Sequence, residues 1–484
     1  MSRLKKQAIN GVLWTTIQTA VTFLTGPLLM IFQARYLTPF EFGILSVIHI
    51  FLSIINVIEN FGISTAIIQR DHVTKNERSS LFFFQIIFTS LVGFVVVLIA
   101  PIIAKIFDME PLRRLLPLLS VMVFLNGPAI VFTAFLEKDF YFKELSLINI
   151  TRQISIFLFT VIFLVAGMGL TGVVLGQIIS VAIMVFLIFY VSHQKDYLHL
   201  KFHFNIKEIL PFIKYGVPIG AKQLMTQLTH HADELIIGYF LSAEILGLYY
   251  FAKNLLNRIR SLVSTAFSKV LLPLLSRVKT DSVRLTRTYN DISKYISVFA
   301  FPLFIGIALT ADLFIPILFG EEWLSSVDFF IILSIAYIPY MLTANVATSL
   351  LYSINKPNLV LYTEVVANAI YIVSLLVISI LDYGIYFVVG LYAIYLILKT
   401  FTLQYLTQLH LHSTFKEYLL LFKPAMLSTG IMAILVLLSK IIILNVPLIE
   451  LTIIIAIGVI GYTFVYLLLD CRTIKDILNL VKSR

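Results

Sequence analysis

Residues 81–104 read LFFFQIIFTSLVGFVVVLIAPIIA and contain no Asp, Glu, Lys or Arg. About 20 consecutive apolar residues make a helix long enough to cross the hydrocarbon core of a bilayer. The segment has to be helical there, because lipid offers backbone groups no hydrogen-bond partner. This stretch therefore predicts a transmembrane helix. It decides the fold class because similar stretches recur along the whole chain.

Thirteen further apolar stretches surround this one, each separated from the next by a short polar segment. In chain order the fourteen are 9–33, 43–66, 81–104, 115–136, 150–168, 171–192, 211–237, 246–270, 295–319, 328–352, 358–380, 384–408, 418–439 and 446–469. Gly167-Met168-Gly169 and Asp382-Tyr383-Gly384 predict tight turns in the two closest pairs. We therefore predict an all-α integral membrane protein with about 14 transmembrane helices, or 12 if one close pair is wrong.

The composition excludes most soluble classes. Of the 484 residues, 59% are hydrophobic and 13% are charged, whereas a soluble protein has about 25% charged residues. A cytosolic enzyme, a nucleic-acid-binding domain and a secreted disulfide scaffold are therefore excluded. The single cysteine, Cys471, cannot form an internal disulfide or a Cys-based metal site, and we expect no metal and no cofactor. The N-terminal apolar run lacks a cleavage site and is predicted to be the first transmembrane helix.

The distribution of basic residues gives the orientation. With the N-terminus inside, 26 of the 36 Lys and Arg residues fall in inner segments and five in outer segments, and five lie within spans. Arg152 is counted among the inner segments. Lys and Arg accumulate on the cytoplasmic side of membrane proteins. The pattern predicts both termini in the cytoplasm.

The chain also contains an internal repeat. Residues 36–44 (YLTPFEFGI) align with residues 240–248 (FLSAEILGL) at an offset of 204, and Gly11-Val12 aligns with Gly216-Val217 at 205. Six helices separate the two copies, so both halves have the same orientation. This predicts a parallel repeat about an axis along the membrane normal.

Short motifs are distributed over both halves of the chain. They are Ala34-Arg35-Tyr36-Leu37-Thr38-Pro39, Phe42-Gly43, Asn60-Phe61-Gly62, Ala66-Ile67-Ile68-Gln69, Gly216-Val217-Pro218, Asp233-Glu234-Leu235-Ile236-Ile237-Gly238, Leu246-Gly247-Leu248-Tyr249 and Leu271-Leu272-Pro273-Leu274-Leu275-Ser276. No single motif is diagnostic. In their order and spacing they resemble a known family, the polysaccharide-transporter flippases of the multidrug/oligosaccharidyl-lipid/polysaccharide exporter superfamily.

The resemblance implies a transporter that moves undecaprenyl-diphosphate-linked oligosaccharide units across the bacterial cytoplasmic membrane, for O-antigen, capsule, exopolysaccharide or teichuronic acid. It implies two six-helix lobes around a cavity that opens alternately to each side. The predicted parts are 1–192 (first lobe), 193–210 (cytoplasmic linker), 211–408 (second lobe) and 409–484 (two more helices and a tail). Expected partners are the lipid-linked glycan, membrane lipid, glycosyltransferases and a polymerase, and no nucleic acid.

Helix 246–270 contains the least lipid-compatible surface. Lys253, Asn257 and Arg260 lie at i, i+4 and i+7 and share one face, while Arg258 points off that face. We interpret the face, together with Arg258, as a substrate-binding wall for the diphosphate, since Arg makes bidentate contacts and Lys supplies a point charge. Pairing with acidic residues of helix 211–237, or snorkelling, remains the alternative.

Other polar groups inside the spans are further candidates. Lys222 and Gln18 are interpreted as substrate-binding, the latter on a polar stripe with Thr22 and Thr25. Asp233, Glu234 and His230 are candidates for ion coupling, or for a structural ion pair to helix 246–270.

Prolines inside the spans raise the possibility of hinges. Gly26, Pro27, Pro218 and Gly220 are hinge candidates in two corresponding helices, and static kinks are the alternative.

Four single charges complete the set. Glu59 and Glu364 are expected to be exposed at the interface, and Asp312 and Lys399 are weaker candidates for the cavity.

Three other functions remain open. A multidrug cation exporter of the same superfamily needs an acidic cavity, which the cations of helix 246–270 argue against. A membrane polymerase or acyltransferase needs catalytic groups clustered in a sizeable loop, and the outer loops here are short, so we predict that the protein is not an enzyme. A scaffold without transport is the last alternative.

Overall fold

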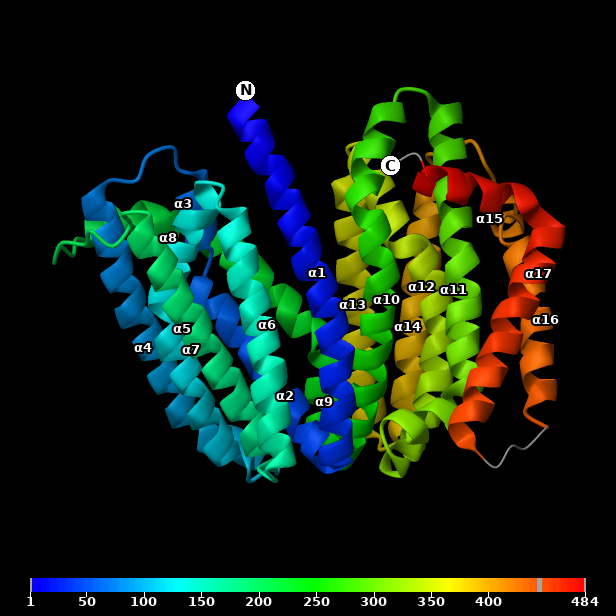
Figure 1. Cartoon of the computed structure of the whole chain (residues 1–484), viewed down its shortest axis with the longest axis horizontal. Coiled ribbons are helices and arrows are strands. Elements are labelled where there is room, and N and C mark those ends of the chain that lie inside the picture. The colour runs from blue at the N-terminus through cyan, green and yellow to red at the C-terminus, as the bar shows by residue number, and fades with distance from the viewer. Residues whose placement is uncertain (1, 442–445, 483–484) are drawn as a thin grey trace. The chain divides into compact units, whose positions relative to one another are not determined.

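The computed structural model describes residues 2–441 and 446–482, without the side chains of residues 2–10, 265–270 and 477–482. The described chain forms helices that pack as two compact units, Met1–Gly247 and Leu248–Arg484 (Figure 1). The first unit contains α1 (Ser2–Tyr36), α2 (Pro39–Asn60), α3 (Ile63–Gln69), α4 (Lys75–Ile106), α5 (Leu112–Lys138), α6 (Phe142–Val165), α7 (Gly169–Gln194), α8 (Ile206–His230), α9 (Ala232–Phe240) and the start of α10 (Ala243–Val278). The second contains the rest of α10, then α11 (Ser282–Leu318), a 3₁₀ turn (Glu321–Ser326), α12 (Val327–Ser353), α13 (Pro357–Ile380), α14 (Ile385–Gln408), α15 (Phe415–Leu420), α16 (Lys423–Ser439) and α17 (Pro447–Lys482).

The predicted fold class is confirmed. In the described part of the chain, 11 helical segments are long and apolar enough to cross a membrane, counting α2 with α3 and the 3₁₀ turn with α12 as single segments. The three other predicted stretches correspond to α8 with α9, to α10, which carries cations, and to α16, which has 17 residues. The chain is therefore a multi-pass membrane protein, and 14 passes are consistent with its helices.

The sequence sets the helix ends locally. The side chains of Thr38, Thr74 and Thr414 each accept a hydrogen bond from the backbone N–H of the residue three positions later. That residue is a glutamate, and its carboxylate accepts a hydrogen bond from the backbone N–H of the threonine. This capping box satisfies backbone donors that the first turn leaves unpaired. Both predicted tight turns are confirmed, since helices end at Val165 and Ile380 and resume at Gly169 and Ile385.

Two predicted spans are interrupted, which corrects the simple picture of one helix per stretch. Stretch 43–66 breaks at Phe61 and Gly62, which have φ of 33° and 77°. A Cβ on Gly62 would lie 2.3 Å from the carbonyl oxygen of Gly216 in α8, so glycine is required both by the backbone and by the close approach. Stretch 211–237 breaks at His231, between α8 and α9.

Each unit has its own packing. In the first, α4 packs on α5, α6 on α7, α5 on α7 and α1 on α6 (Figure 1). In the second, α12 packs between α11 and α14, and α16 and α17 pack on each other and on α11. Helices α8 and α9 belong by their contacts to the first unit. The division into lobes at 192 and 211 remains a prediction.

The two copies of the repeat meet inside the first unit. A Cβ on Gly43 would lie 1.8 Å from the carbonyl oxygen of Ala243, and one on Gly247 would lie 1.8 Å from that of Pro39. The two contacts are counterparts in the repeat, because the offset of 204 relates Pro39 to Ala243 and Gly43 to Gly247. Such reciprocal contacts are typical of a two-fold relation. The first turns of α2 and α10 can approach this closely because glycines, Gly43 and Gly247, stand at the crossing point.

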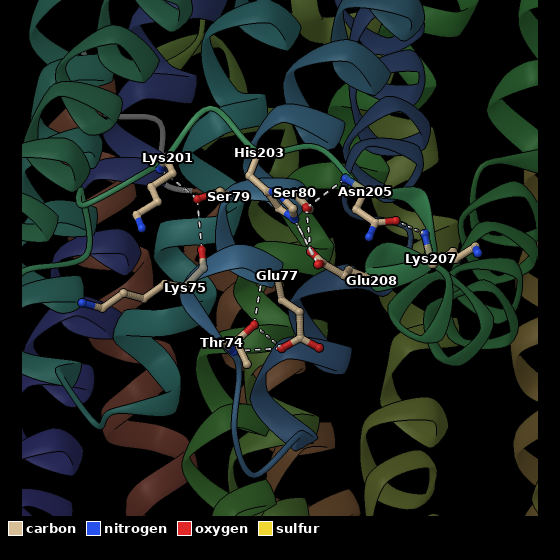
Figure 2. A network of polar contacts seen from close by, with 10 residues as sticks. All are labelled: Thr74, Lys75, Glu77, Ser79, Ser80, Lys201, His203, Asn205, Lys207 and Glu208. Atoms are coloured by element: carbon tan, nitrogen blue, oxygen red, sulfur yellow. Dashed lines mark hydrogen bonds and ion pairs between the residues drawn. The ribbon is translucent and has the colours of Figure 1, made fainter.

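The segment between α7 and α8 is hydrogen-bonded to the first turns of α4 (Figure 2). Ser79 Oγ accepts the N–H of Lys201, and Ser80 Oγ accepts that of Asn205, both at 3.1 Å. Ser80 Oγ also donates to Glu208 at 2.9 Å, and Glu208 lies 3.0 Å from His203 Nε2. The hydrogen bond from His203 lowers the pKa of the Glu208 carboxyl from its ordinary value.

Candidate functional site

The strongest candidate site lies on α10 in the second unit. Lys253 is 2% exposed, and its Nζ lies 5.7 Å and 5.2 Å from the ring centroids of Tyr249 and Tyr392. The guanidinium of Arg260 lies 5.2 Å from the ring centroid of Tyr340 in α12. Aromatic faces attract cations electrostatically, so these contacts stabilise the charges of α10 within an apolar helix bundle.

Further tyrosines extend this arrangement onto α13 and α14. Tyr371 stacks on Tyr395 with ring centroids 4.5 Å apart, and both contact Tyr392 at 5.8 Å and 6.0 Å. Lys399 Nζ donates to the Tyr395 hydroxyl at 3.3 Å and lies 3.7 Å from Glu364 Oε1. We call the set the cation–tyrosine cluster; its members are Lys253, Arg260, Lys399, Tyr249, Tyr340, Tyr371, Tyr392 and Tyr395.

The tyrosines of this cluster were missed by the sequence analysis. A signal for them was present, because Tyr392, Tyr395 and Lys399 lie at i, i+3 and i+7 and share a face of α14. An aromatic stripe at this spacing is ordinary in a buried helix. Only the packing of α14 beside α10's cations gives the stripe a functional interpretation.

Two other predicted residues of α10 lie differently. Arg258 is exposed, and its Nε donates to Asn254 Oδ1 at 2.7 Å. Asn257 is half-buried. The structure therefore places Arg258 off the face of Lys253 and Arg260, as its helical position predicts.

The predicted ion-coupling residues lie at the break between α8 and α9 in the first unit. Asp233 and Glu234 are buried, at 2% and 3% exposure, and His230 is exposed. Glu234 Oε2 accepts from Ser46 Oγ at 3.4 Å and lies 3.1 Å from Nδ1 of His231. The histidine beside Glu234 is thus His231, which the sequence analysis did not assign.

The remaining predicted residues lie on α1 and α8. Gln18 is half-buried and Lys222 is exposed. On the predicted polar stripe, the Thr22 and Thr25 hydroxyls donate to backbone carbonyls of their own helix.

The four hinge candidates lie inside unbroken helices. Gly26 and Pro27 lie within α1, and Pro218 and Gly220 lie within α8. A Cβ on Gly220 would lie 3.0 Å from Phe61 Cα. Their role as hinges remains a prediction.

One single charge differs from expectation. Glu59 is 2% exposed, so the expected interfacial exposure is wrong. Arg152, counted among the inner segments, lies within α6 and lines a cavity with Glu59. Asp312 pairs with Lys440 Nζ at 2.6 Å, while the Glu364 side chain is 54% exposed, as expected.

An apolar groove lies in the second unit between α11, α16 and α17. It has a volume of about 720 Å³, and its lining includes Phe299, Pro302, Met432, Ile455 and Tyr462. Its lining is almost wholly hydrocarbon, which suits an extended apolar chain. Among the described residues, no group of three His, Cys, Asp or Glu side chains is placed to hold a metal ion.

The chain is similar in sequence to proteins of surface-polysaccharide synthesis. A family model described as polysaccharide biosynthesis protein matches residues 32–328. The lipopolysaccharide biosynthesis protein WzxC of Escherichia coli (strain K12) is 23% identical over 320 residues, which cover 66% of this chain and 65% of that protein. The teichuronic acid biosynthesis protein TuaB of Bacillus subtilis (strain 168) is 25% identical over 335 residues, or 69% of each chain. The chain thus matches about two thirds of the length of these relatives.

Two solved structures share the fold. The inward closed conformation of the lipid II flippase MurJ aligns with a TM-score of 0.75 and 17% identity, over 96% of this chain and 100% of that one. The inward-facing conformation of a multidrug resistance MATE family transporter of the MOP superfamily aligns with a TM-score of 0.62 and 12% identity, over 85% and 99%. At these identities the likeness establishes the fold.

Proposed function

This chain belongs to the polysaccharide biosynthesis protein family, and from that premise we propose that it is a flippase for lipid-linked oligosaccharides. Its substrate is an undecaprenyl-diphosphate-linked repeat unit destined for a surface polysaccharide. The names of its relatives, which refer to lipopolysaccharide and teichuronic acid synthesis, support this substrate class. The membrane is the bacterial cytoplasmic membrane, with both termini in the cytoplasm.

The observation that carries the proposal is the cationic face of α10, on which Lys253 is buried and Arg260 is partly buried. Lys253 and Arg260 place two positive charges among tyrosine rings inside a membrane helix bundle. Ionisable groups at such depth are costly and usually mark a substrate or ion pathway. Arg and Lys are the side chains that bind phosphate, so this face suits the diphosphate of the substrate. The rings also supply apolar faces against which a pyranose can pack.

The polyprenyl tail needs a hydrocarbon environment during transfer. The surrounding lipid supplies one, and the apolar groove between α11, α16 and α17 supplies a protein-lined one. In this scheme the diphosphate binds at α10, the tail stays in an apolar phase, and alternating access carries the glycan across. No bond is made or broken, so the protein acts as a transporter and not as an enzyme.

The rival function of a multidrug cation exporter fits the same fold. It is disfavoured by the charge of α10, because the side chains of Lys253 and Arg260 repel an organic cation. Assays of drug resistance and of polymer synthesis in one deletion strain distinguish the two functions.

The direct test removes both cations. The double variant Lys253→Ala/Arg260→Ala is expressed in a strain lacking the chromosomal copy, and surface polymer is quantified at matched protein levels. Polymer output should be lost, because the two cations of the α10 face no longer offset the charge of the diphosphate inside the membrane. Lys279→Ala is the matched control, since Lys279 is an exposed cation just beyond the end of α10. Wild-type polymer output from the double variant refutes the proposed binding face.

A further inference from the structure

A polar cavity lies inside the first unit, separate from the cation–tyrosine cluster. It has a volume of about 410 Å³ and is bounded by α2, α5, α6 and α7. Its polar lining includes His49, Asn56, Glu59, Asn126, Arg152 and Gln177. Polar side chains from four membrane helices therefore converge on one cavity, which an apolar bundle would otherwise fill with hydrocarbon.

Glu59 is the acidic group of this cavity. It lies in the last turn of α2 and is 2% exposed. Its Oε2 accepts from Asn126 Nδ2 of α5 at 2.9 Å, and its backbone carbonyl accepts from Gln85 Nε2 of α4 at 2.6 Å. Both donors are neutral amides. Among the side chains that the structure describes, no basic group lies within ion-pair distance of this carboxyl, so an ionised Glu59 loses its hydration without a direct counter-ion.

Arg152 is the basic group of the same cavity. It projects from α6, on another wall, and is partly buried. A guanidinium stays charged in proteins, so its charge is permanent while that of Glu59 is not. The other titratable group lining the cavity is His49, ten residues before Glu59 in α2 and hence about 15 Å away along the helix axis.

Two opposing effects act on the Glu59 carboxyl. Burial disfavours the carboxylate, while the hydrogen bond from the Asn126 N–H favours it. Glu59 therefore differs from an exposed acid and from a directly ion-paired one, because its carboxyl is buried and hydrogen-bonded to a neutral amide. A metal ion suits the site poorly, because the cavity offers a single carboxylate and Arg152 repels cations. A proton needs only one oxygen.

We propose that Glu59 is the proton-binding site that couples transport to the proton gradient, with Asn126 and Arg152 as its positioning residues. In the loading step a carboxylate oxygen of Glu59 forms an O–H bond with a proton delivered by water, and in the release step that proton returns to water. The inference rests on the proposed flippase function. It moves the coupling site from Asp233, Glu234 and His230 to the cavity of the first unit.

Protonation of Glu59 changes the balance of charge in the cavity. With Glu59 ionised, the formal charges of Glu59 and Arg152 cancel across the cavity. With Glu59 protonated, the charge of Arg152 is uncompensated, and the attraction between α2 and α6 is lost. Proton binding therefore changes the force between two helices of the unit, which is what a coupled conformational change requires.

Infrared spectroscopy tests the proton site independently of transport. Spectra of the purified protein are recorded over a pH series, and the C=O stretch of protonated carboxylic acids is followed. Wild type should contain a pH-dependent band that is missing in Glu59→Gln and kept in Glu364→Gln, the control at a carboxyl that is 54% exposed. Glu59→Gln keeps the shape of the side chain and an acceptor for Asn126, so it preserves packing. An unchanged band in Glu59→Gln overturns the proposal.

Arg152→Gln supplies a second spectroscopic test. Removing the positive charge favours the protonated acid, so the band should persist to higher pH than in wild type. An unshifted band means that Arg152 does not act on Glu59 and overturns the assigned positioning role.

Polymer output separates this inference from the proposed function. Glu59→Gln should lose polymer output while still binding undecaprenyl diphosphate, and Lys253→Ala/Arg260→Ala should lose that binding while keeping the infrared band. Wild-type output from Glu59→Gln overturns the coupling role. If Glu59→Gln and Asn126→Ala lower output but no band titrates, the cavity binds the glycan instead, and the proton site is refuted.

Discussion

The crossing of the two repeat copies leads to a prediction about Gly43 and Gly247. Alanine at either position places a methyl group 1.8 Å from a backbone carbonyl oxygen, where ordinary contact begins at 3.4 Å. A backbone atom cannot rotate away as a side chain can, so the helices must separate. Overpacking of this kind costs about 1–3 kcal/mol or more. The opposing gain in helix propensity from Gly to Ala is about 1 kcal/mol, so we expect a net loss of stability.

The measurement is thermal unfolding of the purified protein in detergent. In a unit of this size, 1 kcal/mol corresponds to roughly 2–4 °C in Tm, so Gly43→Ala and Gly247→Ala should each melt measurably below wild type. Gly390→Ala is the matched control, because Gly390 lies in α14 and no described atom would lie within 4 Å of a Cβ added there. Only the propensity gain acts at this position, and its Tm should equal or exceed that of wild type.

The double variant makes the prediction sharper. Both glycines serve one crossing, so separating the helices to fit the first methyl group also makes room for the second. The loss in Gly43→Ala/Gly247→Ala should therefore be smaller than the sum of the single losses, as for residues that share a contact. Single variants that melt at or above wild type, or strictly additive losses, refute the reciprocal contact.

Three further outcomes follow from local contacts. Glu208→Gln should loosen the segment before α8. Because the pKa of Glu208 is lowered in the folded state, its carboxylate stabilises the fold above its ordinary pKa, and this stabilisation is lost as the pH falls through the lowered pKa. Proteolysis of the segment in the wild-type protein should therefore increase at acidic pH. Tyr392→Ala should lower the stability by about 0.5–2 kcal/mol, and Tyr392→Phe should lower the Tm less, because phenylalanine keeps the ring whose centroid lies 5.2 Å from Lys253 Nζ. Lys440→Ala should cost less than about 1 kcal/mol in a urea titration, because its partner Asp312 is 54% exposed.

Local patterns in the sequence predicted a large part of the structure. Apolar stretches of span length gave the helices, and the glycine-containing turns at 167–169 and 382–384 gave two of their connections. The offset of 204 gave the correspondence between 36–44 and 240–248. Each of these signals depends on neighbouring residues or on a comparison of two segments of the chain, so each can be recognised without the tertiary structure.

The candidate sites depended on contacts between distant residues. Helical periodicity placed Lys253 and Arg260 on one face of α10, but their tyrosine partners on α12 and α14 follow more than 70 residues later in the chain. Glu59 was expected at the interface because it lies near the end of an apolar stretch. Its burial results from Asn126 and Gln85, which neighbouring helices bring to it.

The sequence by itself determined that this protein is a multi-pass helical membrane protein with repeated halves and cations inside one helix. Hydropathy and spacing are local properties, and lipid enforces the helix wherever they are met. Only the tertiary structure decided which charges are buried and what surrounds them. Burial depends on which helix faces turn toward one another, and that choice is made by packing across the bundle, as at the shared cavity of Glu59 and Arg152.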